Sequence, residues 1–159
     1  NLSADNDLID AVLATGADVR IRVTGRSMRP ILNPDDIVIV GAVAADDIAV
    51  GDIVLFRDQH GRFLIHRVIR MDAKTLQTQG DALHIADESV PLTHIVGRVE
   101  QQFSEADRIA DFRTRRWRLL SRSIAVTRQS GVDRLVLGPM RRWGRRKDGQ
   151  SRRPHGDGG

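Results

Sequence analysis

The stretch Val19-Arg20-Ile21-Arg22-Val23-Thr24-Gly25-Arg26-Ser27-Met28-Arg29-Pro30 joins an alternating segment to a tight turn. Its first five residues alternate apolar and charged side chains, and a period of two is typical of a strand with one buried face. The region Gly25–Pro34 holds a glycine and two prolines, residues that end strands and form turns. The stretch therefore predicts a half-buried strand that ends in an exposed, rigid turn carrying Ser27.

Further apolar segments of strand length follow at regular spacing. They are joined by residues rich in Gly, Asp and Pro, including a predicted hairpin turn at Asp58–Gly61. Short strands with such connections indicate a mainly β fold, a coiled barrel or sandwich, over residues 19–103. The predicted strands are Ile37–Val40, Ile53–Phe56, Phe63–Ile69, Thr75–Thr78 and Ile95–Val99.

Helical spacing appears only at the two ends of the chain. Leu8, Ile9, Val12 and Leu13 predict a short helix within residues 1–18, with Gly16 as its stop. Residues 104–140 alternate apolar residues with many arginines, which predicts a basic amphipathic helical appendage. Residues 141–159 consist mainly of Arg, Gly, Ser and Asp and are expected to be disordered. The apolar positions of the appendage are Ile109, Phe112, Leu119, Leu120, Ile124 and Val126.

The composition excludes several kinds of site. The chain has no cysteine, so disulfides, thiol nucleophiles and thiolate metal sites are ruled out. No stretch approaches the roughly 20 apolar residues of a membrane-spanning helix. Charge is divided along the chain: residues 1–107 carry a net −7, and residues 108–159 carry a net +11. Such an asymmetry indicates an acidic folded body with a basic appendage that meets an anionic partner.

Ser27 is a candidate nucleophile because a hydroxyl in a tight turn at a strand end is exposed and rigidly oriented. A main-chain N–H nearby could then stabilise an oxyanion. The alternative is that Ser27 only caps the turn, and both interpretations fit the residues Gly25–Pro30 taken alone.

A serine nucleophile requires a base, and His66 is the best-placed candidate. It lies in the apolar segment Leu64–Val68, whereas the other four histidines lie in turns, loops or the C-terminal tail. Imidazole titrates near neutrality and is the common base in this role. The chain has only two lysines, Lys74 and Lys147, and neither lies in a predicted buried strand. A structural role for a single strand histidine remains the alternative.

The loop that begins at Gly80 carries two carboxylates, Asp81 and Asp87. A histidine base normally donates its second ring N–H to a carboxylate that fixes its tautomer. From the residues alone, either aspartate could serve, and a solvated acidic loop is the alternative.

The order G-x-S-M-x-P, G-D-I-V-x-F, H-R-V, G-D-x-x-x-x-x-D and I-x-G-R-V over residues 19–100 resembles the signal peptidase I family. More narrowly, it resembles the archaeal and endoplasmic-reticulum branch, which includes SipW-like enzymes and has histidine where bacterial members have lysine. The resemblance implies a coiled β-sheet body, also found in LexA-type proteins. It implies that Ser27 is the nucleophile, His66 the general base and Asp87 the acidic member, with Asp81 a second acid in the same loop. Asp36 matches the aspartate of a family Gly-Asp pair whose glycine is replaced here by Asp35.

These observations predict a serine endopeptidase that cleaves after small residues and needs no metal or cofactor. Met28 and the strand Val19–Val23 are candidates for lining the substrate cleft. Residues 108–147 are expected to bring the enzyme to an anionic membrane surface as a peripheral protein, with a cytoplasmic location as the alternative; a nucleic-acid partner is not expected. The competing functions are a LexA-like self-cleaving regulator and a non-catalytic module that binds membrane or nucleic acid. The sequence does not indicate an oligomeric state.

Overall fold

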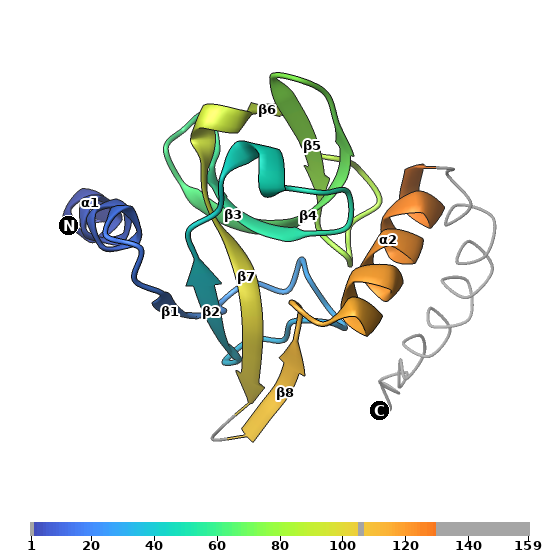
Figure 1. Ribbon diagram of the computed structural model, residues 1–159, viewed down its shortest axis with the longest axis horizontal. Helices are drawn as coiled ribbons and strands as arrows, with labels where there is room; N and C mark the ends of the chain where they lie inside the picture. Colours follow the sequence, from blue (N-terminus) through green and yellow to red (C-terminus); the bar gives the residue numbers. More distant parts are fainter. Residues whose placement is uncertain (1, 105–106, 130–159) are drawn as a thin grey trace, which may run out of the picture.

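Eight antiparallel strands form one curled, half-barrel sheet, preceded by a short helix and followed by a second one (Figure 1). The computed structural model describes residues 2–104 and 107–129. The strand order is β1-β2-β7-β3-β4-β5-β6, and β8 pairs with β7. The mainly β prediction is therefore confirmed. The helices are α1 (Leu2–Ala14) and α2 (Arg115–Gln129), and the strands are β1 (Val19–Arg22), β2 (Ile37–Gly41), β3 (Ile53–Arg57), β4 (Phe63–Met71), β5 (Thr75–Gln79), β6 (Ser89–Pro91), β7 (Ile95–Ser104) and β8 (Asp107–Asp111).

Strand β3 shows how the sheet buries both of its faces. Its side chains alternate between two apolar clusters, as expected when successive residues of a strand point to opposite faces. Ile53 and Leu55 belong to one cluster, with Met28 and Val38, whereas Val54 and Phe56 belong to the other cluster. A short run of buried residues can thus supply two cores at once because the sheet curls.

The alternating segment at the start of the chain has the predicted conformation. Val19 and Ile21 are half-buried in β1, whereas Arg20 and Arg22 are exposed. The strand pairs with β2 alone, with Val19 opposite Val40 and Arg22 opposite Ile37. β1 is consequently an edge strand of the sheet.

The prediction that a helix extends over Ile109 and Phe112 is wrong. Ile109 lies in β8, and Phe112 packs against the core cluster that contains Met28. The physical reason is that β7 continues to Ser104, beyond the part that pairs with β3, and there pairs with Asp107–Asp111 instead. The loop that begins at Gly80, predicted to extend to Pro91, ends in a short strand, β6. The expected disordered tail, residues 141–159, lies outside the described residues.

The second helix packs closely against the sheet through small residues. Gly51 has φ +103, and a Cβ there would lie 2.8 Å from both the Ser121 carbonyl carbon and the Arg122 nitrogen. Ser121 and Ala125 are buried on the same side of the helix. α2 is therefore part of the folded body. Among the described residues, no helix has the length and apolar character needed to cross a membrane.

Candidate active site

Ser27 lies in the turn that follows β1, and the chain around it is held by main-chain hydrogen bonds. Val23 donates to the Asp36 carbonyl at 2.8 Å, and Leu32 donates to the Met28 carbonyl at 3.0 Å. The intervening turn thus presents the half-buried Ser27 from a fixed backbone. Within the described part of the chain, the N–H groups of Ser27 and Met28 donate to no protein acceptor.

His66 reaches the Ser27 hydroxyl from the middle of the sheet. The residue is buried in β4, with 5% of its surface exposed. Its Nε2 lies 2.9 Å from Ser27 Oγ, and its Nδ1 lies 2.6 Å from Asp87 Oδ2. One continuous hydrogen-bonded chain therefore joins Ser27, His66 and Asp87. The first and the last of these lie 60 residues apart in the sequence.

Asp87 is held by the neighbouring strand β5. The Thr78 hydroxyl donates to Asp87 Oδ2 at 2.6 Å, and the Asp87 N–H donates to the Thr78 carbonyl at 2.8 Å. Gln77 Nε2 donates to the Asp87 carbonyl at 3.2 Å. These bonds orient the carboxylate toward the imidazole, and 22% of the side chain remains exposed.

With His66 neutral and protonated at Nδ1, the arrangement allows proton transfer from serine. Nδ1–H then donates to Asp87, and Nε2 accepts from the Ser27 hydroxyl. This is the hydrogen-bond order of a serine–histidine–aspartate triad, in which the carboxylate fixes the tautomer and stabilises the imidazolium that forms.

Asp81 does not contact His66. Its carboxylate accepts from Arg67 Nε at 2.9 Å and from an Arg67 terminal nitrogen at 2.7 Å. Both side chains are almost wholly buried, with exposed fractions of 1% for Arg67 and 2% for Asp81. The two aspartates of the loop thus have different partners, and Asp81 takes part in a buried ion pair.

The backbone beside Asp81 touches the nucleophile directly. Ala82 N–H donates to the Ser27 carbonyl at 2.7 Å. A Cβ at Gly80 would lie 2.7 Å from the Ser27 carbonyl oxygen and 2.9 Å from Ser27 Cβ. Only glycine fits this contact without a shift of the main chain, so the loop position fixes the position of Ser27.

Met28 lies in the core, with 2% of its surface exposed, rather than on an open surface. It packs beneath the Ser27 turn in the same cluster as Val23, while Ile21 and Ile65 lie at the partly buried edge of that cluster.

The aspartate that matches the family's Gly-Asp pair, Asp36, has a structural role here, because its carboxylate accepts from Gln102 Nε2 at 2.7 Å. Asp35 has φ +73, the left-handed region that favours glycine, which explains the glycine of the family motif.

Sequence reasoning assigned no role to four residues that shape the site. Arg67 could have been found, because an arginine inside a buried strand requires a partner and the loop aspartates were the available ones. Thr78 and Gly80 carry a weaker signal, since a hydroxyl and a glycine are common at strand ends. Arg128 carries none, because the groups to which it donates hydrogen bonds are main-chain carbonyls of a loop that lies far away in the sequence. Lys74 is exposed, and Lys147 lies outside the described residues.

Comparison with known proteins agrees with the fold and identifies the family. A protein-family model described as "Signal peptidase, peptidase S26" matches residues 9–130, well over half of the chain. No curated protein matches the sequence significantly. The chain therefore belongs to the signal peptidase family, peptidase S26.

Proposed function

We propose that this peptidase cleaves peptide bonds with Ser27 as nucleophile, His66 as general base and Asp87 as the acid that orients His66. The observation that carries the proposal is the pair of hydrogen bonds from His66, at 2.9 Å to Ser27 Oγ and 2.6 Å to Asp87 Oδ2. A serine hydroxyl is a weak nucleophile at its own pKa and needs such a base.

In the first step, Ser27 Oγ attacks the peptide carbonyl while His66 Nε2 takes the hydroxyl proton. The oxyanion that forms accepts from main-chain N–H groups near Ser27, of which the Ser27 N–H has no protein acceptor within the described residues. His66 then protonates the leaving amine, which leaves an acyl group on Ser27. A water molecule deprotonated by His66 hydrolyses that ester and restores the site.

The substrate would enter as an added strand next to Ser27. β1 pairs only with β2, and the first half of β4, Phe63–His66, pairs only with β3 among the described strands. Unpaired strand edges bind extended peptides through main-chain hydrogen bonds. Ile21 and Ile65 border this position, above the buried Met28. Such a shallow apolar lining suits small side chains before the scissile bond.

The test is cleavage of peptides with alanine at the first and third positions before the bond. The wild-type chain should cut directly after the alanine at the first position before the bond. A bulky residue at either the first or the third position should block cleavage. Ser27→Ala should abolish the products while keeping the melting temperature, and Ser123→Ala, on the exposed side of α2, should behave as wild type. Equal activity of Ser27→Ala would contradict the proposal, and a loss of mass by the chain incubated alone would indicate self-cleavage instead.

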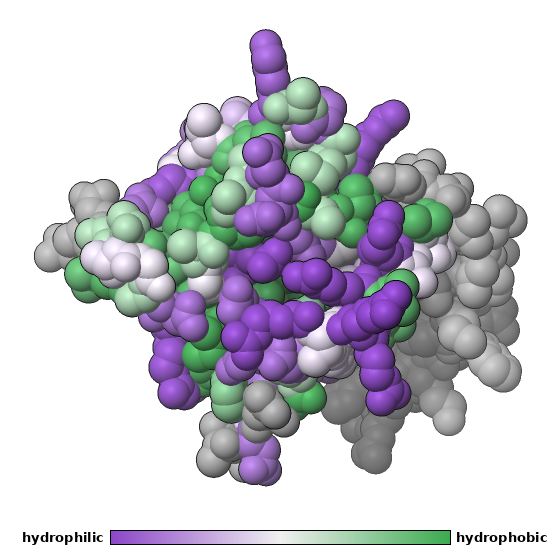
Figure 2. Space-filling model, in the orientation of Figure 1, coloured by the Kyte–Doolittle hydropathy of each residue, from purple (hydrophilic) through white to green (hydrophobic). Residues whose placement is uncertain are grey.

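We also propose that the outer side of α2 attaches the enzyme to an anionic membrane surface. Leu119, Leu120 and Val126 are 60%, 47% and 54% exposed, although the opposite side of the helix is packed on the body. In Figure 2, hydrophobic and hydrophilic side chains lie side by side over the region that α2 occupies. Apolar side chains flanked by arginines are typical of helices that lie in the interface of anionic bilayers.

Three arginines on one stripe of α2 carry the electrostatic part of that proposal. Arg115, Arg118 and Arg122 follow the i, i+3, i+7 spacing and line a cavity of about 330 Å³, in which four arginines, counting Arg98, outnumber the two carboxylates Asp47 and Asp52. Each arginine near an anionic surface contributes about 1 kcal/mol. Co-sedimentation with vesicles containing phosphatidylserine should fall when all three become glutamine, and should also fall in high salt. Binding to neutral vesicles alone, or to DNA but not vesicles, would contradict this proposal.

A further inference from the structure

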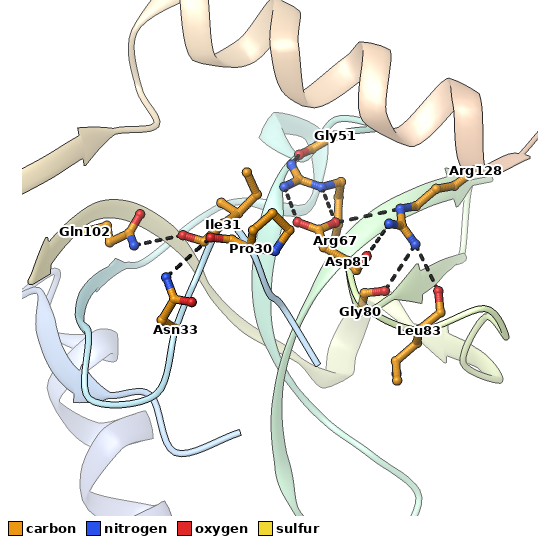
Figure 3. A network of polar contacts seen from close by, with 10 residues as sticks. All are labelled: Pro30, Ile31, Asn33, Gly51, Arg67, Gly80, Asp81, Leu83, Gln102 and Arg128. Carbon is orange, nitrogen blue, oxygen red and sulfur yellow. Dashed lines mark hydrogen bonds and ion pairs between the residues drawn. The ribbon is translucent and has the colours of Figure 1, made fainter. Parts of the chain in front are cut away.

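A second polar network, separate from the Ser27–His66–Asp87 chain, connects α2 to the loop Gly80–Leu83, which packs against Ser27. Figure 3 shows two arginines that approach this loop from different elements, Arg67 from β4 and Arg128 from α2. Besides binding Asp81, Arg67 donates from its third guanidinium nitrogen to the Gly51 carbonyl at 2.9 Å.

Arg128 binds the main chain of the loop. One terminal nitrogen donates to the Leu83 carbonyl at 2.9 Å and to the Gly80 carbonyl at 3.4 Å. The other donates to the Asp81 carbonyl, and the Arg128 Nε lies 4.0 Å from the Asp81 carboxylate. The side chain is 14% exposed, so this contact is largely shielded from water. A single guanidinium thus donates to the carbonyls of Gly80, Asp81 and Leu83 in one loop, and its planar fork of donors has a fixed geometry that the flexible ammonium of lysine lacks.

The position of this loop controls the position of the nucleophile. Ala82 donates to the Ser27 carbonyl, and the Gly80 backbone has no room for a Cβ against Ser27. α2 is itself fixed, because its backbone at Ser121 and Arg122 is in close contact with Gly51. The path from α2 to Ser27 therefore consists of a docked helix, the largely shielded Arg128 and the loop Gly80–Leu83.

We infer that Arg128 is a positioning residue that sets the geometry between Ser27 and His66 by fixing the loop Gly80–Leu83. The inference rests on the proposed function of Ser27 and His66. It predicts an effect on the chemical step more than on binding, because the loop that Arg128 binds, Gly80–Leu83, is not one of the proposed substrate edges, β1 and the start of β4. Misplacement of a reacting group by about 1 Å can reduce a rate about 10²-fold.

The experiment compares kcat and KM for the full chain with those of Arg128→Ala, Arg128→Lys and Arg116→Ala. Arg116 is an exposed arginine of the same helix that serves as the matched control. Arg128→Ala should lower kcat about 10²-fold with little change in KM, and Arg128→Lys should lower it less. Guanidinium ion, at concentrations well below those that unfold proteins, should restore part of the activity of Arg128→Ala. Arg116→Ala should already match the wild type, so the ion should not raise its activity.

The competing possibility is that Arg128 only docks the helix. Activity of Arg128→Ala that falls in proportion to the unfolded fraction, with no guanidinium rescue, would overturn the inference. Should Arg128→Ala not fold, Arg128→Lys at wild-type kcat would overturn it equally. A wild-type chain that cleaves no peptide would overturn the proposed function itself. If the wild-type chain cleaves and Arg128→Ala has the same kcat, only this inference is overturned.

Discussion

His66 and Arg67 are neighbours in β4, yet they take part in two different sites. His66 contacts Ser27 and Asp87 in a chain that remains partly open to solvent, whereas Arg67 forms an ion pair with Asp81 that is nearly closed to it. Both aspartates belong to one loop. Because successive side chains of a strand point to opposite faces, the neighbours His66 and Arg67 bind opposite ends of that loop, at Asp87 and Asp81. Under the proposed mechanism, the difference teaches that the loop's two carboxylates have separate roles: Asp87 orients the base, and Asp81 holds the loop in place.

The largest expected effect comes from breaking the His66 side of the comparison. His66→Ala should reduce kcat by about 10³–10⁶, and the double variant with Ser27→Ala should be no worse than either single variant, because the groups act as a unit. Steady-state rates on one peptide measure both. Losses that multiply in the double variant would show that the two residues act independently.

Replacing each aspartate by asparagine sharpens the comparison between activity and stability. Asp87→Asn should reduce kcat by about 10⁴-fold, because asparagine at this position no longer fixes the His66 tautomer. The free energy of unfolding should change little. Asp81→Asn leaves Arg67 buried without its counter-charge, which should cost about 3–5 kcal/mol of unfolding free energy. Urea unfolding and peptide cleavage of the two variants separate these effects. The reverse pattern would assign the catalytic role to Asp81.

A smaller effect is expected where the two sites meet, at Gly80. Gly80→Ala should push the Ser27 main chain away and lower kcat by about 10² without changing any catalytic group. Gly61→Ala is the control for an added Cβ that meets nothing: unlike Gly80, Gly61 has positive φ, but no atom lies within 4 Å of the Cβ that alanine would add there. The control should lose about 1–2 kcal/mol of stability and keep its activity per folded molecule. Equal kcat in both variants would show that the loop does not position Ser27.

The smallest effect is expected at Thr78, which donates to the same Asp87 oxygen as His66. Thr78→Val removes one hydrogen bond of about 1 kcal/mol while it keeps the shape of the side chain. The cleavage rate should fall by less than about tenfold. A loss as large as that of Asp87→Asn would make Thr78 an essential part of the site.

Local patterns predicted the parts of the fold that depend on local sequence. The alternation at Val19–Val23 predicted β1, and the apolar runs predicted β2, β3 and β4. Ile109 and Phe112 misled because their spacing of three also fits a helix, whereas the pairing of β8 depends on the length of β7. Ser27 and His66 were recognisable because each is a reactive side chain in an unusual local setting. Arg128 was not, since the carbonyls it binds lie 45–48 residues away and leave no mark on the sequence.

The most direct test of the central claim is to trap the acyl group on Ser27. A peptide ester mixed with the wild-type chain, quenched in acid within the first turnover and digested, should show the acyl mass on the fragment that contains Ser27. The same experiment with His66→Ala should show none. An acyl group on another residue, or rapid cleavage by the wild-type chain with no acyl group on Ser27 at any quench time, would contradict the account.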